Sequence, residues 1–204
     1  MHRELASPAD WISPDNRTPN IKTDPLAWDG KKVSILDTDH IWGHGGTSAW
    51  VWKSFLRGHN PILMDSWEPI PGTPCGSVNW ASQPGHPTRD LNRRDDPTWE
   101  PVRRAMGHAR SYSLRMNLTA AAPHGELASS GYCLANPGKE YLVYLPEGDE
   151  VRLDLTPVQG ELESEWMHPV EGTITPGGKV KGGANRRFTV PFLGPAVLYC
   201  KTIE

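Results

Sequence analysis

The sequence predicts an α/β segment followed by an all-β domain, with the boundary near residue 125. Two short apolar runs, residues 33–36 and 61–64, flank a stretch with helical spacing, which is the pattern of a strand–helix–strand unit. After residue 127 the apolar residues recur with the period of a strand, and turn-forming residues follow at short intervals. The predicted fold class is therefore α/β plus all-β.

Length and composition narrow the possible classes of protein. A chain of 204 residues with a formal net charge of -3 can bury a core in one or two domains and offers no basic surface for nucleic acid. It contains no apolar run long enough for membrane insertion, and its N-terminal residues lack the apolar core of a signal peptide. Three cysteines without a CxxC motif predict neither disulfides nor a zinc site, and Cys133 and Cys200 fit buried core positions.

The first unit is predicted to contain two buried strands, residues 33–36 and 61–64, joined by a helix over residues 48–58. Such a connection makes the two strands parallel, with a right-handed crossover. Functional groups in parallel sheets gather beyond the carboxyl ends of the strands. That edge carries four polar side chains: Asp37, Asp39, His40 and Asp65.

Two long connections are predicted to be ordered loops. Residues 1–30 are rich in Pro, Asp and Asn, and Trp11 and Trp28 are expected to pin them by packing. Residues 66–97 contain too many prolines for a helix. Because a loop of this length within a compact domain is usually functional, we expect it to form a wall of an active site.

A long helix is predicted over residues 98–121, with Asp95 or Asp96 as its cap and Pro123 as its stop. Its apolar face consists of residues at helical spacing: Val102, Ala105, Met106, Ala109, Tyr112 and Met116. Beyond it, two hairpin turns and further short strands predict a small antiparallel sandwich or barrel. The turns are at residues 136–138 and 147–149, and the further strands at 162–167, 178–181, 187–192 and 196–201.

The strand over residues 141–144 carries apolar side chains on both faces, which predicts burial between a second sheet and the α/β part. Four aromatic residues of this domain are more simply explained as core or cross-strand pairs than as a sugar or peptide platform: Tyr141, Tyr144, Trp166 and Tyr199.

Two β/α units cannot close a (β/α)₈ barrel, which needs eight strands and roughly 250 residues. Parallel strands tipped with carboxylates and followed by a long helix nevertheless match the last part of such a barrel. We therefore expect an incomplete C-terminal quarter of a (β/α)₈ barrel in residues 1–124 and a small antiparallel β-sandwich in residues 125–204. Exposed sheet edges of an incomplete barrel would favour self-association.

Several long motifs together resemble one known family. They are SPADWISP, DTDHIWG, WVWKSFLRGHNPILMD, RRAMG, YCLANPGKEYLVYLP and VPFLGPAVLY. The chain resembles the C-terminal part of the apiosidase-like glycoside hydrolases, in which a (β/α)₈ barrel precedes a β-sandwich often labelled "putative collagen-binding domain of a collagenase". The resemblance implies that DTDHIWG is the seventh barrel strand with its loop and NPILMD the eighth. It also implies a secreted or periplasmic bacterial parent protein and an acid/base carboxylate on an earlier strand, outside this chain.

Glycoside cleavage requires two carboxyl groups, about 5 Å apart for retention or about 6.5–9.5 Å apart for inversion. Asp37 and Asp39 would point to the same side of a strand that extended through both. We predict a catalytic carboxylate among these two, with the choice between them open. A structural alternative is that Asp37 binds backbone amides of the turn while Asp39 and His40 cap the loop.

Four residues are predicted to bind substrate: His40, Trp42, Asp65 and Trp67. The two indole rings suit the flat apolar faces of sugars. For the two polar residues a structural role is an equally simple explanation. His40 could form a structural hydrogen bond, and Asp65 could form a salt bridge with Arg57 or Lys53. The D-x-D-H spacing matches no standard metal-binding loop, so neither a metal nor another cofactor is expected.

The expected function is that of a C-terminal fragment of a glycoside hydrolase, acting on plant or bacterial polysaccharide by two-carboxylate catalysis and inactive alone. An alternative of a different class is a non-catalytic β-sandwich module that binds polysaccharide or a collagen-like extracellular protein. A third is a structural brace that covers the last helix of the barrel.

Overall fold

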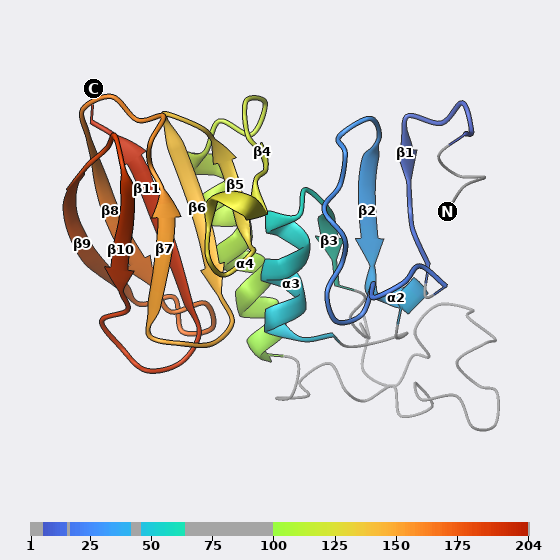
Figure 1. The fold of residues 1–204 in the computed structure, drawn as a ribbon. Helices are drawn as coiled ribbons and strands as arrows, with labels where there is room; N and C mark the ends of the chain where they lie inside the picture. Colours follow the sequence, from blue (N-terminus) through green and yellow to red (C-terminus); the bar gives the residue numbers. More distant parts are fainter. Residues whose placement is uncertain (1–5, 16, 42–45, 64–99, 204) are drawn as a thin grey trace.

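The computed structural model describes residues 6–15, 17–41, 46–63 and 100–203. A small parallel sheet with its helices lies on one side of the molecule and a β-sandwich on the other, with helix α4 (Glu100–Arg115) between them (Figure 1). None of the helices in these ranges is long and apolar enough to cross a membrane.

The parallel sheet has the strand order β1-β2-β3 and consists of β1 (Trp11–Ile12), β2 (Val33–Asp37) and β3 (Asn60–Ile62). Both pairings are parallel, which confirms the predicted direction of the two strands. The expectation that residues 1–30 contain no regular structure was wrong, because Trp11 and Ile12 pair with Val33 and Ser34. Two residues are too few to produce a detectable period in the sequence.

Helix α3 (Ser48–Leu56) connects β2 to β3 and confirms the predicted crossover helix. The Thr47 side chain caps its start by accepting a hydrogen bond of 3.1 Å from the Trp50 backbone N–H. The helix is buried on most sides, with Trp52 and Leu56 wholly inaccessible to solvent. Its packing positions the parallel sheet against the rest of the molecule.

Three details of the N-terminal part differ from expectation. Strand β3 is not buried, since Asn60 and Ile62 are exposed and β3 has only β2 as a neighbour among the described strands. The chain also turns directly after Asp37 into the short helix α2 (Thr38–Ile41). Trp11 is 59% exposed and does not pin the N-terminal segment, whereas Ile12 is buried.

Helix α4 confirms the predicted long helix and its apolar face, of which Val102, Ala105, Ala109 and Tyr112 are buried. It ends at Arg115, earlier than predicted, and the Asn117 backbone N–H then donates to Glu140 Oε2 at 2.9 Å. The helical spacing of the sequence continues past this end because the following residues are mainly small or apolar. A two-residue strand, β4 (Ala122–Pro123), and a 3₁₀ turn, η3 (Gly125–Leu127), lead into the sandwich.

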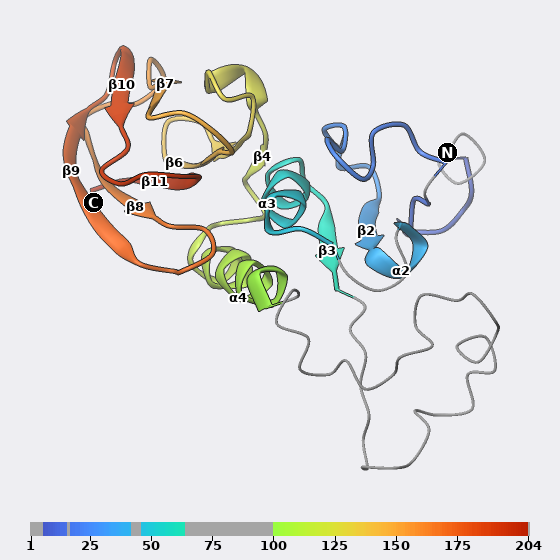
Figure 2. The same ribbon diagram turned by 90° about the horizontal axis from the view of Figure 1, so that it is seen from below.

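The sandwich consists of a six-stranded sheet, in the order β4-β5-β6-β11-β8-β9, and a two-stranded sheet of β10 and β7 that lies over it (Figures 1 and 2). All its pairings are antiparallel, as predicted. The strands are β5 (Cys133–Asn136), β6 (Glu140–Leu145), β7 (Glu150–Asp154), β8 (Glu161–Met167), β9 (Ile174–Lys181), β10 (Asn185–Thr189) and β11 (Ala196–Thr202).

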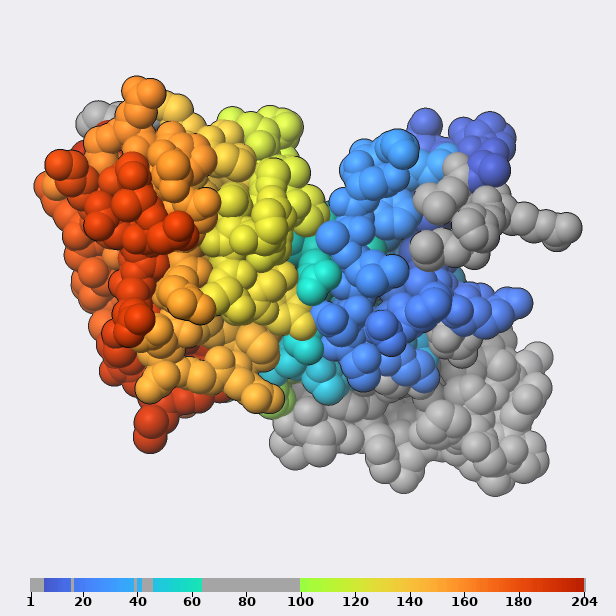
Figure 3. Space-filling view, viewed as in Figure 1, coloured from blue at the N-terminus to red at the C-terminus, as the bar shows by residue number. Residues whose placement is uncertain are grey.

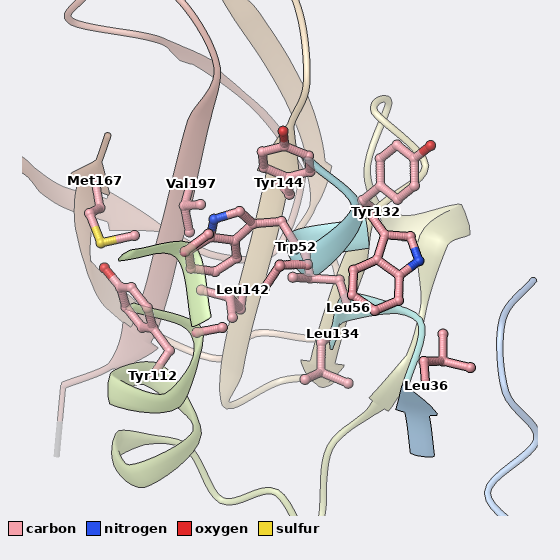
Figure 4. Packing of buried hydrophobic residues seen from close by; sticks show 14 of the residues in the cluster. Leu36, Trp52, Leu56, Tyr112, Tyr132, Leu134, Leu142, Tyr144, Met167 and Val197 are labelled. Atoms are coloured by element: carbon pink, nitrogen blue, oxygen red, sulfur yellow. The ribbon is translucent and has the colours of Figure 1, made fainter. Parts of the chain in front are cut away.

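Strand β6 is buried on both faces, which confirms the prediction from its sequence. Tyr141 and Val143 face the core between the two sheets, whereas Leu142 and Tyr144 face the core that contains α3 and α4. In that second core Trp52 lies 6.2 Å from both Tyr112 and Tyr144, measured between ring centroids. Figure 4 shows these rings converging from α3, α4 and β6. One core therefore runs across the expected domain boundary near residue 125.

Candidate functional site

The carboxyl ends of the three parallel strands meet at one edge of the sheet, because all three run in the same direction. Ser13 follows β1, Asp37 ends β2 and Leu63 follows β3. This is the edge at which parallel α/β folds carry their functional groups. Of the predicted site residues, Asp37 and His40 lie here with described side chains.

Asp37 lies on the open face of the parallel sheet. Side chains alternate along β2, so that Val33, Ile35 and Asp37 share one face while Ser34 and Leu36 are buried on the other, toward α3. Asp37 is only partly buried and is in register with the exposed Ile62 of β3. Its carboxylate is thus directed away from the helices that cover the back of the sheet.

Asp37 and Asp39 do not share a strand, so the condition under which strand alternation would point them to the same side is not met. The chain enters α2 at Thr38, and two residues of a helix are separated by about 200° around its axis rather than by one strand period. Asp39 belongs to α2 by its backbone, and its side chain lies outside the described part.

His40 is held from the neighbouring strand. Its Nδ1 lies 2.9 Å from Oγ of Ser13, which follows β1, so this hydrogen bond joins the ends of β1 and β2. The ring is exposed, and Ser13 is its one hydrogen-bond partner within the described ranges. Ser13 was not a candidate from the sequence, because no motif signals a serine after a two-residue strand.

The other predicted site residues, Trp42, Asp65 and Trp67, lie outside the described residues. Two basic residues considered as partners of Asp65 have contacts elsewhere. Arg57 Nη2 lies 3.5 Å from Asp24 Oδ1, and Lys53 Nζ donates to the Thr23 carbonyl at 3.1 Å. Within the described ranges, no group of His, Cys, Asp and Glu side chains has the arrangement of a metal site.

The open face of the parallel sheet is apolar. Trp11, Val33 and Ile62 are 59%, 52% and 45% exposed, and the strand register brings them onto the same side as Ile35 and Asp37. Parallel sheets are normally covered on both faces, because the crossover connections between their strands place helices there. The face that carries Asp37 is therefore one that the described part of this chain leaves uncovered.

His59 fastens the back of the sheet. The buried ring lies between β2 and the N-terminal segment, with Nδ1 2.7 Å from Ser34 Oγ and Nε2 2.8 Å from the Leu26 carbonyl. A carbonyl only accepts, so Nε2 donates and Nδ1 accepts from the Ser34 hydroxyl. Burial lowers the pKa of His59 below its usual 6.5, and the nearby Arg57 charge acts in the same direction.

We expect the free energy of unfolding to decrease as the pH falls below about 6.5. In this range the unfolded chain binds a proton at His59, whereas the folded chain does not, because its His59 has a lower pKa. The stability is fully present above the unfolded pKa and declines until the lowered folded pKa is reached. Urea unfolding midpoints across this range measure the effect. The variant His59→Gln, which cannot titrate, should have a smaller slope, and an unchanged slope would contradict the assignment.

The aromatic and cysteine residues of the sandwich are part of its core. Tyr141, Tyr144, Trp166 and Tyr199 are at most 5% exposed, which confirms packing and leaves no aromatic platform among them. Cys133 and Cys200 are buried and free, as predicted, and burial raises the pKa of both thiols. Cys75 lies outside the described residues.

A groove of about 450 Å³ lies between the two parts of the molecule, lined by Trp28, His59, Pro123 and Leu134 among others. It is visible in Figure 3 as the hollow between the blue and the yellow-green surfaces. It is on the helix side of the parallel sheet, away from the face that carries Asp37.

The sequence and the structure are similar to known proteins of two kinds, a domain family and a class of enzyme. Residues 124–195 match a family described as "Putative collagen-binding domain of a collagenase". Two solved structures that resemble 86% of the chain are described as glycoside hydrolases. No curated protein matches the chain.

Two solved structures illustrate the likeness. A protein described as a glycoside hydrolase has a TM-score of 0.56 and 14% sequence identity, over 86% of this chain and 44% of its own. A glycoside hydrolase family 5 protein from Bacteroides vulgatus has a TM-score of 0.59 and 15% identity, over 86% of this chain and 42% of its own. At these identities the likeness concerns the fold, and the chain spans less than half the length of either protein.

Proposed function

We propose that this chain is the C-terminal part of an apiosidase-like glycoside hydrolase acting on plant or bacterial polysaccharide, with Asp37 as one carboxyl group of the active site. The supporting observation is the place of Asp37, at the carboxyl end of β2 and on the uncovered face of a parallel sheet. In a (β/α)₈ barrel one face of every strand points to the interior and the other to the surrounding helices. Leu36 faces the helices here, so Asp37 faces the interior side.

Three strands of the chain, rather than two, belong to the proposed barrel. The short β1 continues the parallel sheet beyond β2, so β1, β2 and β3 become its sixth, seventh and eighth strands. The exposed apolar side chains of these strands would pack in the barrel interior, beneath the catalytic edge. In the absence of the other strands, the same face would favour association between copies of the chain.

The proposed active site is completed by groups on both sides of Asp37. His40 binds a sugar hydroxyl through the ring nitrogen that Ser13 does not occupy. Trp42 and Trp67 stack on the sugar, and Asp65 hydrogen-bonds it. The second carboxyl group comes from an earlier strand, at the separation that decides between retention and inversion. Asp39 is the alternative to Asp37, and its place on α2 disfavours it.

We expect the chain by itself to show no glycosidase activity, because the second carboxyl group that cleavage requires is not at this edge among the described residues. A version extended by the missing N-terminal strands of the proposed barrel should cleave polysaccharide. Release of reducing sugar from xylan, pectin and arabinogalactan measures both proteins. Turnover by the chain alone, equal to that of the extended protein, would refute the division of the active site.

A second role, as a brace, is favoured by the interface between the sandwich and α4. The rings of Tyr112 on α4 and Tyr199 on β11 lie 5.3 Å apart, and Arg115 at the end of α4 pairs with Glu165 of β8 at 2.6 Å. A module attached by a flexible linker would not share a core with the preceding domain. The sandwich therefore supports the proposed last helix of the barrel whatever else it binds.

A further inference from the structure

A cleft of about 570 Å³ lies on the outer side of the six-stranded sheet, beside the end of α4. Figure 2 shows α4 next to β8 and to the bend that joins β8 to β9. The cleft is far in sequence from the parallel sheet and shares none of its residues. The residues that carry the argument are Arg115, Glu163, Glu165, Ile174, Pro176 and Lys201.

One wall of the cleft is held rigidly. The Arg115 guanidinium lies 4.9 Å and 4.8 Å from the ring centroids of Tyr112 and Tyr199, and its Nη1 donates to Glu165 Oε1 at 2.6 Å. The Tyr112 hydroxyl donates to the same carboxylate oxygen at 2.9 Å. These contacts restrict the rotamers of both charged side chains, which reduces the entropy that a ligand must remove on binding.

The floor of the cleft places charges of both signs in adjacent strands. Glu163 of β8 is in register with Lys201 of β11, and Glu165 of β8 with Pro176 of β9. The Glu163 carboxylate has no hydrogen bond or ion pair to any residue within the described ranges. Exposed Ile174 and Pro176 add an apolar side. The cleft thus combines hydrogen-bond acceptors, donors and an apolar surface within a volume typical of ligand sites.

We propose that this cleft binds a neutral oligosaccharide. Arg115 is paired with Glu165, and Lys201 Nζ lies 3.5 Å from Oε1 of the buried Glu140, so no unpaired cation of the cleft selects an anion, whereas each sugar hydroxyl both donates and accepts. The carboxylates accept from hydroxyls, Arg115 and Lys201 donate to them, and Ile174 and Pro176 contact the C–H faces of the ring. This site binds saccharide without cleaving it, and it does not depend on the catalytic role of Asp37.

A collagen-like peptide fits the same groups less well. Proline lacks a backbone N–H, and in a Gly-X-Y chain only the hydroxyproline side chains carry hydroxyl groups. The two carboxylates, which only accept, would lose water on contact with such a chain and gain fewer donors than a saccharide offers. A ligand rich in hydroxyl groups satisfies them.

Titration calorimetry of the full chain with cellohexaose, xylohexaose and mannohexaose tests the proposal. At least one hexasaccharide should bind, and Glu163→Gln should weaken that binding about tenfold or more, because a charged acceptor is lost. The matched control is Glu161→Gln, an exposed glutamate two residues earlier on β8 that does not line the cleft and should bind like the wild type. Equal urea midpoints of the two variants establish that both are folded.

Three outcomes would overturn the assignment: no binding of any hexasaccharide, binding that Glu163→Gln leaves unchanged, or stronger binding of a triple-helical Pro-Hyp-Gly peptide. The last result would assign the cleft to a peptide. Binding that survives Asp37→Asn but not Glu163→Gln separates this site from the proposed active site. The proposal of a saccharide-binding cleft and the proposal of a catalytic Asp37 can therefore fail independently of each other.

Discussion

Replacing Asp37 by Asn in the extended protein is expected to lower kcat for polysaccharide cleavage by about 10²-fold or more, with little change in KM. The substitution preserves the size of the side chain and removes the charge that a nucleophile or general base requires. Asp37 ends β2 on the open face of the sheet and is only partly buried, so the loss of its charge should not unfold the protein. Initial rates of reducing-sugar release and a urea midpoint measure the two effects separately.

The matched control is Asp10→Asn, the same chemical change at the opposite end of the same sheet. Asp10 precedes β1, is exposed, and contributes its backbone carbonyl to the Val33 N–H at 2.9 Å, a bond that the substitution leaves intact. Its kcat should equal that of the wild type. Full activity of Asp37→Asn would remove Asp37 from the active site and return the role to Asp39.

Replacing Trp52 by Ala is expected to lower the free energy of unfolding by about 3–5 kcal/mol. Trp52 is 0% exposed, contacts the Tyr112 and Tyr144 rings, and donates from its indole nitrogen to the Pro169 carbonyl at 3.3 Å. The substitution leaves a cavity where α3, α4 and the sandwich meet, together with an unpaired carbonyl. Urea unfolding followed by circular dichroism measures the loss.

Trp11→Ala is the control for this effect, because Trp11 is 59% exposed on β1 and its removal creates no cavity. We expect it to change the free energy of unfolding by less than about 0.5 kcal/mol. The shape of the Trp52→Ala transition is also informative. If the sandwich and the parallel sheet depend on this core, they unfold together in the wild type, and the variant separates them into two transitions. Two separate transitions already in the wild type would show that the shared core does not couple them.

The elements predicted correctly are those whose sequence contains a full period. The residues from Val102 to Met116 present about four turns of regular helical spacing, and β7 and β8 alternate over several residues, so their burial could be read directly. Positive φ angles at Gly138 and Gly148 agree with the hairpin turns expected there. Such a pattern shows which face of a helix or strand is buried and which is exposed to water, and it can be recognised within the one element that contains it.

The errors occurred where local pattern and tertiary contact differ. Strand β1 exists because β2 offers it a pairing edge, and two residues carry no period. Strand β3 has the apolar residues of a buried strand and yet is exposed on one face, because no described element covers it. The end of β2 near Asp37 was predicted, but the helix α2 that begins directly after it was not, and this helix sets the geometry of the two aspartates.

The sequence by itself determined the order of β2, α3, β3 and α4, the parallel direction of β2 and β3, and the antiparallel sandwich, because each follows from hydrophobic period and connection length. Only the tertiary structure decided that Asp37 faces the open side of the sheet, that Ser13 contacts His40, and that Arg115 and Glu165 form a cleft wall with Glu163 below it. These groups come from segments far apart along the chain, and their proximity arises from strand register and helix packing, which no single stretch of sequence encodes.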